Sequence, residues 1–150
     1  MTGFAQTPPS YIPVGWRIPQ PSDFKENGGW SYYLQGQGYL PYYAAADFNS
    51  DGVVDVAWLL INDIKKEYGL FVFINKSGSY VKALEKLGCV DCQLWDAAGK
   101  KNPKYDMVGR VDRAIVHLAN SKNMICFGVF ESSSICYSWD RTKQAFVQQY

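Results

Sequence analysis

Short apolar segments separated by turn-forming residues occupy most of the chain. From residue 28 onward, runs rich in branched aliphatic and aromatic side chains alternate with Gly, Asn, Asp and Ser, a spacing that predicts β-strands. The expected strands are residues 30–34, 39–46, 53–61, 70–75, 80–87, 114–119, 124–130, 135–139 and 145–149. We therefore predict an all-β fold, an antiparallel meander of about eight or nine strands that forms a sandwich or a partial, propeller-like structure.

Two segments depart from simple strand alternation. Residues 53–61 are apolar at almost every position apart from Asp55, so we expect both faces of this strand to be covered. Five of the seven prolines fall within the first 22 residues, which disfavours regular helix or central strand there. We interpret residues 1–27 as an extended arm and residues 28–150 as a single domain, and expect Trp16 and Ile18 to pack onto it.

Length and charge narrow the class of protein. A chain of 150 residues fits one domain, and folding at this size buries roughly 70% of the unfolded surface. The net charge is +1, which argues against nucleic acid or an anionic membrane as partner. The longest apolar run, residues 56–61, is too short to span a bilayer. Aromatic residues make up 16% of the chain and only one histidine is present, which favours binding over histidine-based catalysis.

The four cysteines are expected to form two disulfides. Cys126 and Cys136 flank a hairpin pattern centred near Glu131, which places them opposite each other. Cys89 and Cys92 form a close pair without the helix that a thioredoxin-like motif requires. A four-thiolate zinc site would need a second close pair. Two disulfides favour an oxidising compartment, and four reduced thiols in a cytosolic protein remain the alternative.

The first residues carry a hint about localisation. They lack the charged and apolar regions of a signal peptide, yet residues 3–5 (Gly-Phe-Ala) have the form of a signal cleavage site. We therefore expect the chain to correspond to the trimmed form of a periplasmic protein, with the cytoplasm as the alternative.

The strongest local motif is an acidic loop. Oxygen ligands recur at alternate positions, as a hard cation such as Ca²⁺ requires. The candidate ligands are the side chains of Asp47, Asn49, Asp51 and Asp55 and the backbone carbonyl of Val53. An EF-hand is not expected, because its twelfth position would be Trp58 and both flanks read as strand. The alternative is an Asx-rich turn that binds nothing.

This loop carries a resemblance to a known type of repeat. Residues 46–52 (Ala-Asp-Phe-Asn-Ser-Asp-Gly), followed by residues 54–57 (Val-Asp-Val-Ala), resemble the calcium loop of FG-GAP or VCBS β-repeats, found in integrin propellers and bacterial exported proteins. The likeness extends over about residues 39–150. It implies a structural Ca²⁺ ion, although one acidic loop and 150 residues are too few for a full propeller.

No catalytic constellation is expected. His117 lies in an apolar predicted strand, which favours a structural role. Residues 132–134 (Ser-Ser-Ser) lack the glycines of a nucleophile elbow. Nor does the sequence suggest the paired carboxylates of a glycosidase. We therefore predict that the protein is not an enzyme, and a hydrolase with an unrecognised site is the least favoured alternative.

A second motif suggests a protein partner. Ser77, Gly78, Ser79 and Tyr80 form a polar turn between two apolar strands, and they resemble the Ser-Gly-x-Tyr loop of periplasmic lysozyme inhibitors. In that family the loop enters the enzyme's cleft and its hydroxyls engage the catalytic carboxylates. The resemblance implies an exported immunity protein that blocks a secreted, lysozyme-like peptidoglycan hydrolase. A hairpin turn without a partner is the alternative reading of the segment.

A competing function is a calcium-dependent carbohydrate-binding or adhesion module. In this reading, aromatic side chains stack on sugar rings. The candidate aromatic residues are Trp30, Tyr32, Tyr33, Tyr42 and Tyr43. Alternating aromatic residues in strands are more often core and cross-strand pairs, so this function is the second choice.

Overall fold

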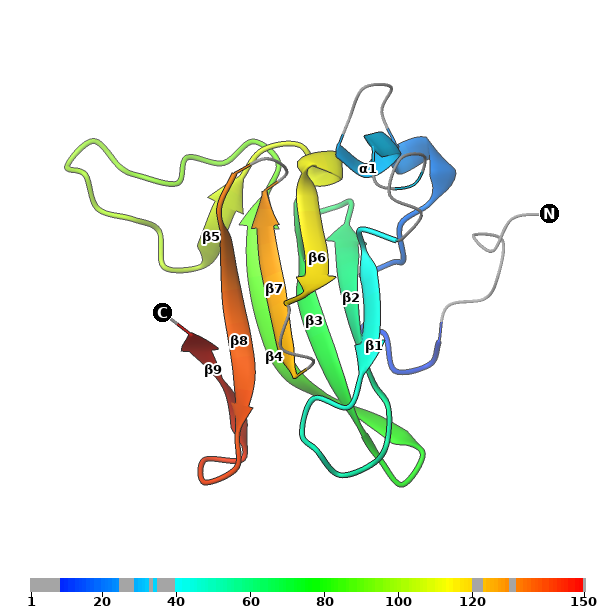
Figure 1. Cartoon of the computed structure of the whole chain (residues 1–150). Coiled ribbons are helices and arrows are strands. Elements are labelled where there is room, and N and C mark those ends of the chain that lie inside the picture. Colours follow the sequence, from blue (N-terminus) through cyan, green and yellow to red (C-terminus); the bar gives the residue numbers. More distant parts are fainter. Residues whose placement is uncertain are drawn as a thin grey trace.

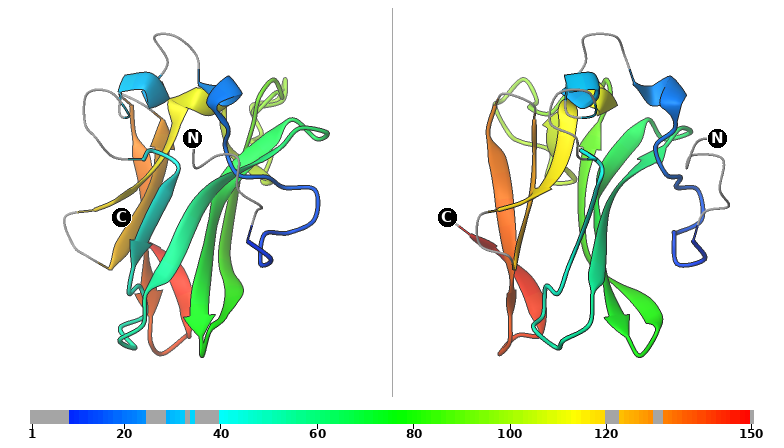
Figure 2. Two further views of the ribbon diagram at one scale, coloured as in Figure 1. Left: turned by 90° about the vertical axis from the view of Figure 1, so that its right-hand side faces the viewer. Right: turned by 45° about the vertical axis from the view of Figure 1, so that its right-hand side comes forward.

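The computed structural model describes residues 9–24, 29–32, 34, 40–119, 123–129 and 132–149. Within these ranges two sheets pack face to face, as Figures 1 and 2 show. The strands are β1 (Tyr43–Ala46), β2 (Asp55–Asn62), β3 (Glu67–Lys76), β4 (Ser79–Cys89), β5 (Tyr105–Val108), β6 (Ala114–Leu118), β7 (Met124–Val129), β8 (Ser134–Asp140) and β9 (Ala145–Gln149). The helices are η2 (Pro21–Asp23), α1 (Gly29–Tyr32) and η4 (Val111–Arg113). The predicted all-β sandwich is confirmed.

The first sheet has the strand order β1-β2-β3-β4-β5. Its first four strands are antiparallel neighbours, and β3 and β4 form a long hairpin in which Lys76 pairs with Ser79. Ser77 and Gly78 connect them with positive φ angles of 54° and 90°. A two-residue turn with both φ angles positive is of type I′, which matches the twist of the flanking strands.

The second sheet has the order β6-β7-β8-β9 and is antiparallel throughout. Its inner face contributes Ile125 and Phe127 to the core between the sheets, where they meet Leu59 and Leu70 of the first sheet. All four of these side chains are at most 1% exposed. The apolar positions that alternate along the strands therefore form a continuous core, as the two-residue side-chain period of a strand requires.

The N-terminal segment 9–24, here called the arm, covers the outer face of the first sheet (Figure 2). The ring of Tyr11 lies 4.7 Å from that of Phe73, and the ring of Trp16 lies 4.7 Å from that of Phe71. Ile18 packs against the same apolar cluster. The arm explains why β2 and β3 are buried on both faces, and it confirms the expected packing of Trp16 and Ile18.

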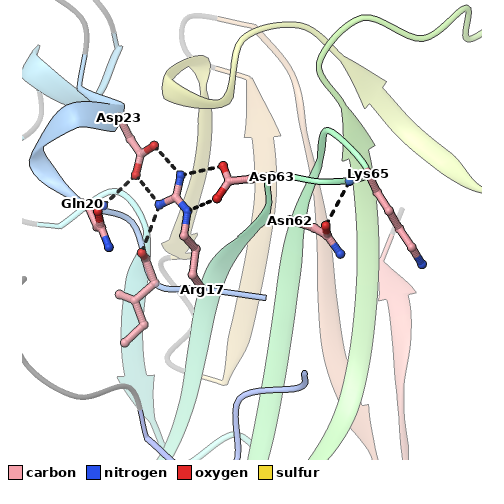
Figure 3. Close-up of polar contacts among 7 residues, drawn as sticks. Arg17, Gln20, Asp23, Asn62, Asp63 and Lys65 are labelled. Carbon is pink, nitrogen blue, oxygen red and sulfur yellow. Dashed lines mark hydrogen bonds and ion pairs between the residues drawn. The ribbon is translucent and has the colours of Figure 1, made fainter. Parts of the chain in front are cut away.

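Arg17 fastens the arm to the sheet (Figure 3). Its backbone exchanges two hydrogen bonds with Ile61, with N···O distances of 2.9 and 3.0 Å. Its guanidinium group donates two hydrogen bonds to Asp23, both of 2.8 Å, and two to Asp63, of 2.5 and 3.0 Å. A fifth hydrogen bond, of 3.4 Å, goes to the carbonyl oxygen of Ile18. All five donors of the guanidinium are thus occupied.

Two elements differ from the sequence-based expectation. Residues 29–32 form the short helix α1, not the start of a strand. Trp30 is fully buried there, and its Nε1 donates a 2.6 Å hydrogen bond to the carbonyl oxygen of Ala114. This partner is 84 residues away in the chain, so local alternation of side chains could not predict it. Residues 33, 39 and 130 of the expected strands lie outside the described residues.

The second difference is β5, which interrupts the meander. It pairs in parallel with β4, where Leu87 faces Tyr105 and Cys89 faces Val108. The sequence analysis assigned no strand to residues 105–108. A four-residue strand is short, and parallel pairing requires a connection that leaves and re-enters the sheet, so the local pattern contains little signal for it.

Candidate functional site

The two motifs that the sequence analysis selected meet at one end of the sandwich, the lower end in Figure 1. There the acidic loop, residues 47–55, connects β1 to β2, and the hairpin turn of Ser77 and Gly78 connects β3 to β4. Their proximity follows from the register, because Ala46 pairs with Asp55 and Val56 pairs with Phe73.

Backbone N–H groups hold the carboxylates of the exposed part of the loop. Asp47 accepts hydrogen bonds from the N–H groups of Asp51 and Gly52, at 3.1 and 2.7 Å. Asp51 accepts one from Val53, at 2.9 Å. Ser50 and Gly52 have positive φ angles of 61° and 87°, which tighten the turn. The segment thus has the compact geometry of an Asx-rich loop.

Asp55 is the buried member of the loop. It is fully inaccessible, and its two carboxylate oxygens accept hydrogen bonds from the N–H groups of Phe48, at 2.9 Å, and Asn75, at 2.8 Å. Burial raises the pKa of Asp55, the two backbone hydrogen bonds act in the opposite direction, and the charges of Asp51 and Asp47 raise it further. Negative charge is therefore unfavourable at this point of the loop.

The oxygen atoms of the acidic loop suit Ca²⁺ in type. Among the described residues, no group of three or more His, Cys, Asp or Glu side chains is placed to hold a metal ion. One observation does fit a cation: the Oδ1 atom of Asn49 is buried and has no hydrogen-bond partner. A buried oxygen without a donor is costly, and a cation would satisfy it. Calcium binding by Asp47, Asn49, Asp51, Val53 and Asp55 stays a prediction.

The hairpin turn exposes three of its four predicted partner-binding residues. Ser77, Gly78 and Ser79 are exposed, whereas Tyr80 is half-buried. The Tyr80 ring lies 4.7 Å from the ring of Tyr11 in the arm. The two serines therefore lie on the surface, whereas the ring of Tyr80 packs against the arm.

Asn75 joins the turn to the acidic loop. Its side-chain Oδ1 accepts a 2.8 Å hydrogen bond from the N–H of Gly78, and its Nδ2 donates one of 3.4 Å to the carbonyl oxygen of Val54. Its own N–H bonds to Asp55. The sequence analysis did not select Asn75. Its position two residues before the Ser-Gly turn was the available signal, since Asn side chains commonly cap such turns.

Three exposed valines accompany these polar groups. Val53 and Val54 in the loop and Val81 on β4 are 41%, 55% and 45% exposed. Aliphatic side chains beside a preformed polar turn are typical of a protein-binding surface, although single exposed valines are common on any protein.

Both predicted disulfides are present. Cys126 and Cys136 pair across β7 and β8, and Cys89 bonds to Cys92 at the end of β4. All four cysteines are therefore used. Their pairing is compatible with an oxidising compartment.

A buried carboxylate that the sequence analysis missed lies at the opposite end of the sandwich. Glu67, at the start of β3, is 2% exposed. It accepts hydrogen bonds from the Tyr105 hydroxyl and from Lys104 Nζ, the latter at 2.7 Å. Burial alone would raise the pKa of Glu67, but the hydrogen bonds from Lys104 and Tyr105 outweigh burial and lower it. The cluster links β5 to β3 and serves the fold.

The remaining candidates offer limited chemistry. His117 is half-buried, and its Nδ1 lies 3.4 Å from the carbonyl oxygen of Leu118. A hollow of about 410 Å³ beside it, between β1 and β6, is lined mainly by apolar side chains. Its lining residues are Leu40, Tyr43, Ala44, Val116, His117 and Leu118. No carboxylate is among these described residues, so the hollow contains no acid–base pair of the glycosidase type.

The aromatic residues of the carbohydrate hypothesis are mostly not on the surface. Trp30 and Tyr42 are 0% and 3% exposed, and Tyr43 packs against Trp58 with a centroid distance of 4.5 Å. The side chains of Tyr32 and Tyr33 lie outside the described residues. The buried rings are therefore core residues, as alternating aromatics usually are.

Comparison with known proteins gave no relative. No protein-family model matches the chain, and neither a curated protein nor a solved structure is significantly similar to it. Among the described residues, no helix has the length and apolar character needed to cross a bilayer.

Proposed function

We propose that the protein is an exported bacterial immunity protein or inhibitor that binds and blocks a secreted, lysozyme-like peptidoglycan hydrolase. The observation that carries the proposal is the exposed turn of Ser77, Gly78 and Ser79, held in type I′ geometry at the end of β3, a strand that is buried except for its last two residues. A loop that is ordered before binding loses little conformational entropy when it enters a cleft.

The chemistry of the turn suits an acidic active site. The hydroxyls of Ser77 and Ser79 are donors, and the exposed Lys76 adds a positive charge beside them. Lys82, by contrast, is bound to Glu85 at 2.6 Å. Hydrogen bonds to ionised carboxylates are stronger than neutral ones, which would reward insertion of this turn between the two catalytic carboxylates of a glycosidase.

The other features agree with an inhibitor that works in the periplasm. Two disulfides suit an oxidising compartment, and Ca²⁺ bound by the acidic loop would hold the surface next to the turn. In this proposal the protein has no catalytic activity of its own, and neither nucleic acid nor membrane insertion contributes.

Inhibition of purified lysozyme-like hydrolases tests the proposal. We expect wild-type protein to inhibit at least one of them, and Ser79→Asp to weaken inhibition about 100-fold, because the new carboxylate would face the catalytic carboxylates. Ser132→Asp, at an exposed residue between the end of β7 and the start of β8, is the matched control and should inhibit normally. Equal inhibition by both variants would remove the turn from the interface, and no inhibition by wild type would reject the function.

A further inference from the structure

We propose that the free edge of β1 binds an extended peptide segment of another protein, which adds an antiparallel strand there and carries a basic residue at its N-terminal end. This site is separate from the hairpin turn, and the proposal does not rest on the inhibitor function. It rests on the two strand edges that border the hollow between β1 and β6.

β1 turns half of its backbone polar groups away from its own sheet. The N–H of Leu59 donates a 2.8 Å hydrogen bond to the carbonyl oxygen of Tyr42, so Tyr42 is hydrogen-bonded to the next strand. Hydrogen-bonded pairs alternate along an antiparallel ladder, which directs the N–H and C=O groups of Tyr43 and Ala45 to the opposite side. β1 is the outermost strand of its sheet, and Ala45 is exposed. This edge therefore offers two donors and two acceptors to a further strand.

The facing edge of β6 meets the start of the β1 segment and then leaves it. The N–H of Ala119 bonds to the carbonyl oxygen of Met124, at 3.0 Å, so the same alternation directs Val116 and Leu118 away from β7. The N–H of Val116 donates a 2.7 Å hydrogen bond to the carbonyl oxygen of Pro41. Past this contact the two strands diverge in both views of Figure 2, and within the described residues they form no ladder with each other.

Leu118 shows that the core is uncovered between the two edges. Residues two apart share a face of a strand, so Leu118 points to the same side as Ala114 and Val116. Those two side chains are 1% and 0% exposed, whereas Leu118 is 40% exposed. An apolar side chain that covered Leu118 would therefore gain the free energy of burying both surfaces.

The hollow has room for such a side chain. Its volume is about 410 Å³, within the ordinary range of ligand sites, and its lining is mainly apolar. Beyond the last residues of β1 and β6, a 3.4 Å hydrogen bond joins Asn123 to Ser50. The opening is therefore about as long as β1, which has four residues, and it matches four residues of an extended partner.

The charge at the end of β1 selects the composition of the partner. Asp47 directly follows β1, and Asp51 is exposed in the same loop. Both carboxylates accept hydrogen bonds from backbone N–H groups and have no cationic partner among the described residues. Antiparallel pairing is the more stable kind, and an antiparallel strand begins where β1 ends. A Lys or Arg as the first residue of the peptide would thus lie beside Asp47.

A second copy of the chain fits this edge less well. Pairing of β1 with its own copy would present Ala44 and Ala46 on the core side, and their methyl groups would leave most of the hollow empty. Nor would it bring a basic residue to Asp47, because β1 reads Tyr-Ala-Ala-Ala. A foreign segment with larger aliphatic side chains at alternate positions meets both requirements.

Selection of a displayed library of random seven-residue peptides on the full chain tests the site. We expect the enriched sequences to have Lys or Arg followed by aliphatic residues at alternate positions. A synthetic peptide of the enriched sequence is then titrated by calorimetry. Replacing its basic residue by Gln should weaken binding about fivefold at low salt and have little effect at high salt. Equal binding of both peptides at low salt would overturn the role of the acidic loop.

The first variant is Ala45→Pro, which removes an outward N–H and keeps the hydrogen bonds between β1 and β2. It should weaken peptide binding about tenfold or more, because one hydrogen bond is lost and the ring obstructs the edge. Gln148→Pro is the matched control. By the same alternation the N–H of Gln148 points outward from β9, the outermost strand of the second sheet, and this variant should bind normally.

The second variant leaves the backbone of β1 unchanged. Leu118→Asn removes the apolar contact and should weaken peptide binding about tenfold, whereas Val90→Asn, at a side chain that is also 40% exposed, should not. Failure to enrich any sequence would overturn the proposal, as would equal binding of the peptide to wild type and Leu118→Asn. A peptide-free dimer that Ala45→Pro dissociates would assign the edge to a second copy and overturn it as well.

Discussion

Carboxylates at one end of the sandwich are bound by cationic side chains, whereas those at the other end are bound by backbone N–H groups. At the end shown in Figure 3, Arg17 binds Asp23 and Asp63, and Lys104 binds Glu67 nearby. Arg17 lowers the pKa of Asp63. At the other end, the carboxylates of Asp47, Asp51 and Asp55 accept hydrogen bonds from backbone N–H groups, and the pKa of Asp55 is raised.

The first end therefore has a structural role, and the second end is the candidate binding surface. Opposite charges at the first end stabilise the arm and β5. Like charges gathered at the second end leave a favourable interaction for a cation to supply. The end with unfavourable charge is also the end that exposes Ser77 and Ser79, which is why we place binding there.

The strongest way to disturb the second end is Asp55→Ala. It leaves the buried N–H groups of Phe48 and Asn75 without acceptors, and each such loss costs about 1–3 kcal/mol. We expect the free energy of unfolding to fall by about 3 kcal/mol, measured by urea denaturation with chelator present. Asp55→Asn retains one acceptor and should lose about half as much. A loss below about 0.5 kcal/mol for the alanine variant would show that Asp55 does not hold the loop.

At the first end, Arg17→Ala should lower the free energy of unfolding by about 2 kcal/mol, because it removes two bidentate ion pairs from a half-buried position and leaves the Asp23 carboxylate without a counter-charge. Proteolysis of the arm in native protein should accelerate as its fastening is lost. Lys66→Ala is the matched control, since the Lys66–Asp91 pair is exposed and 3.5 Å long, and it should change stability by less than about 0.5 kcal/mol. Similar values for both variants would refute a special role for Arg17.

The pH dependence of stability gives the smallest and most selective test. The folded-state pKa values of Glu67 and Asp63 are lowered, so their contribution is fully present above the unfolded pKa, about 4, and is lost as pH falls through the folded values. Asp55, with a raised pKa, acts in the opposite direction. We therefore expect Glu67→Gln to flatten the loss of stability below about pH 4, measured by denaturation at a series of pH values. If the stability of this variant falls below pH 4 as steeply as that of the wild type, Glu67 does not make the proposed contribution.

The strands and disulfides were largely predictable because their signals are local. Eight of the nine strands within the described residues follow from alternation and turn residues, and Cys126 faces Cys136 because a hairpin fixes which positions oppose each other. The Ser77–Gly78 turn was equally visible. In each case the deciding partners lie close together along the chain.

The elements that were missed depend on distant partners. Trp30 enters α1 because its indole reaches Ala114, and Arg17 is fixed by Asp63, which is 46 residues further along. The spacing of residues along the sequence does not predict such contacts. The same holds for the candidate site, where Asp55 and Asn75 are 20 residues apart and the sequence analysis linked neither one to the other.

The amino-acid sequence by itself therefore determined most of the β-architecture, the position of Cys126 opposite Cys136 and the identity of the two motifs, since side-chain period and turn chemistry act over a few residues. Only the tertiary structure decided that the arm covers the outer face of the first sheet, that Tyr80 turns toward Tyr11, and that the acidic loop and the hairpin turn share Asn75. These contacts arise from strand register and burial, which bring together residues that local preference cannot relate.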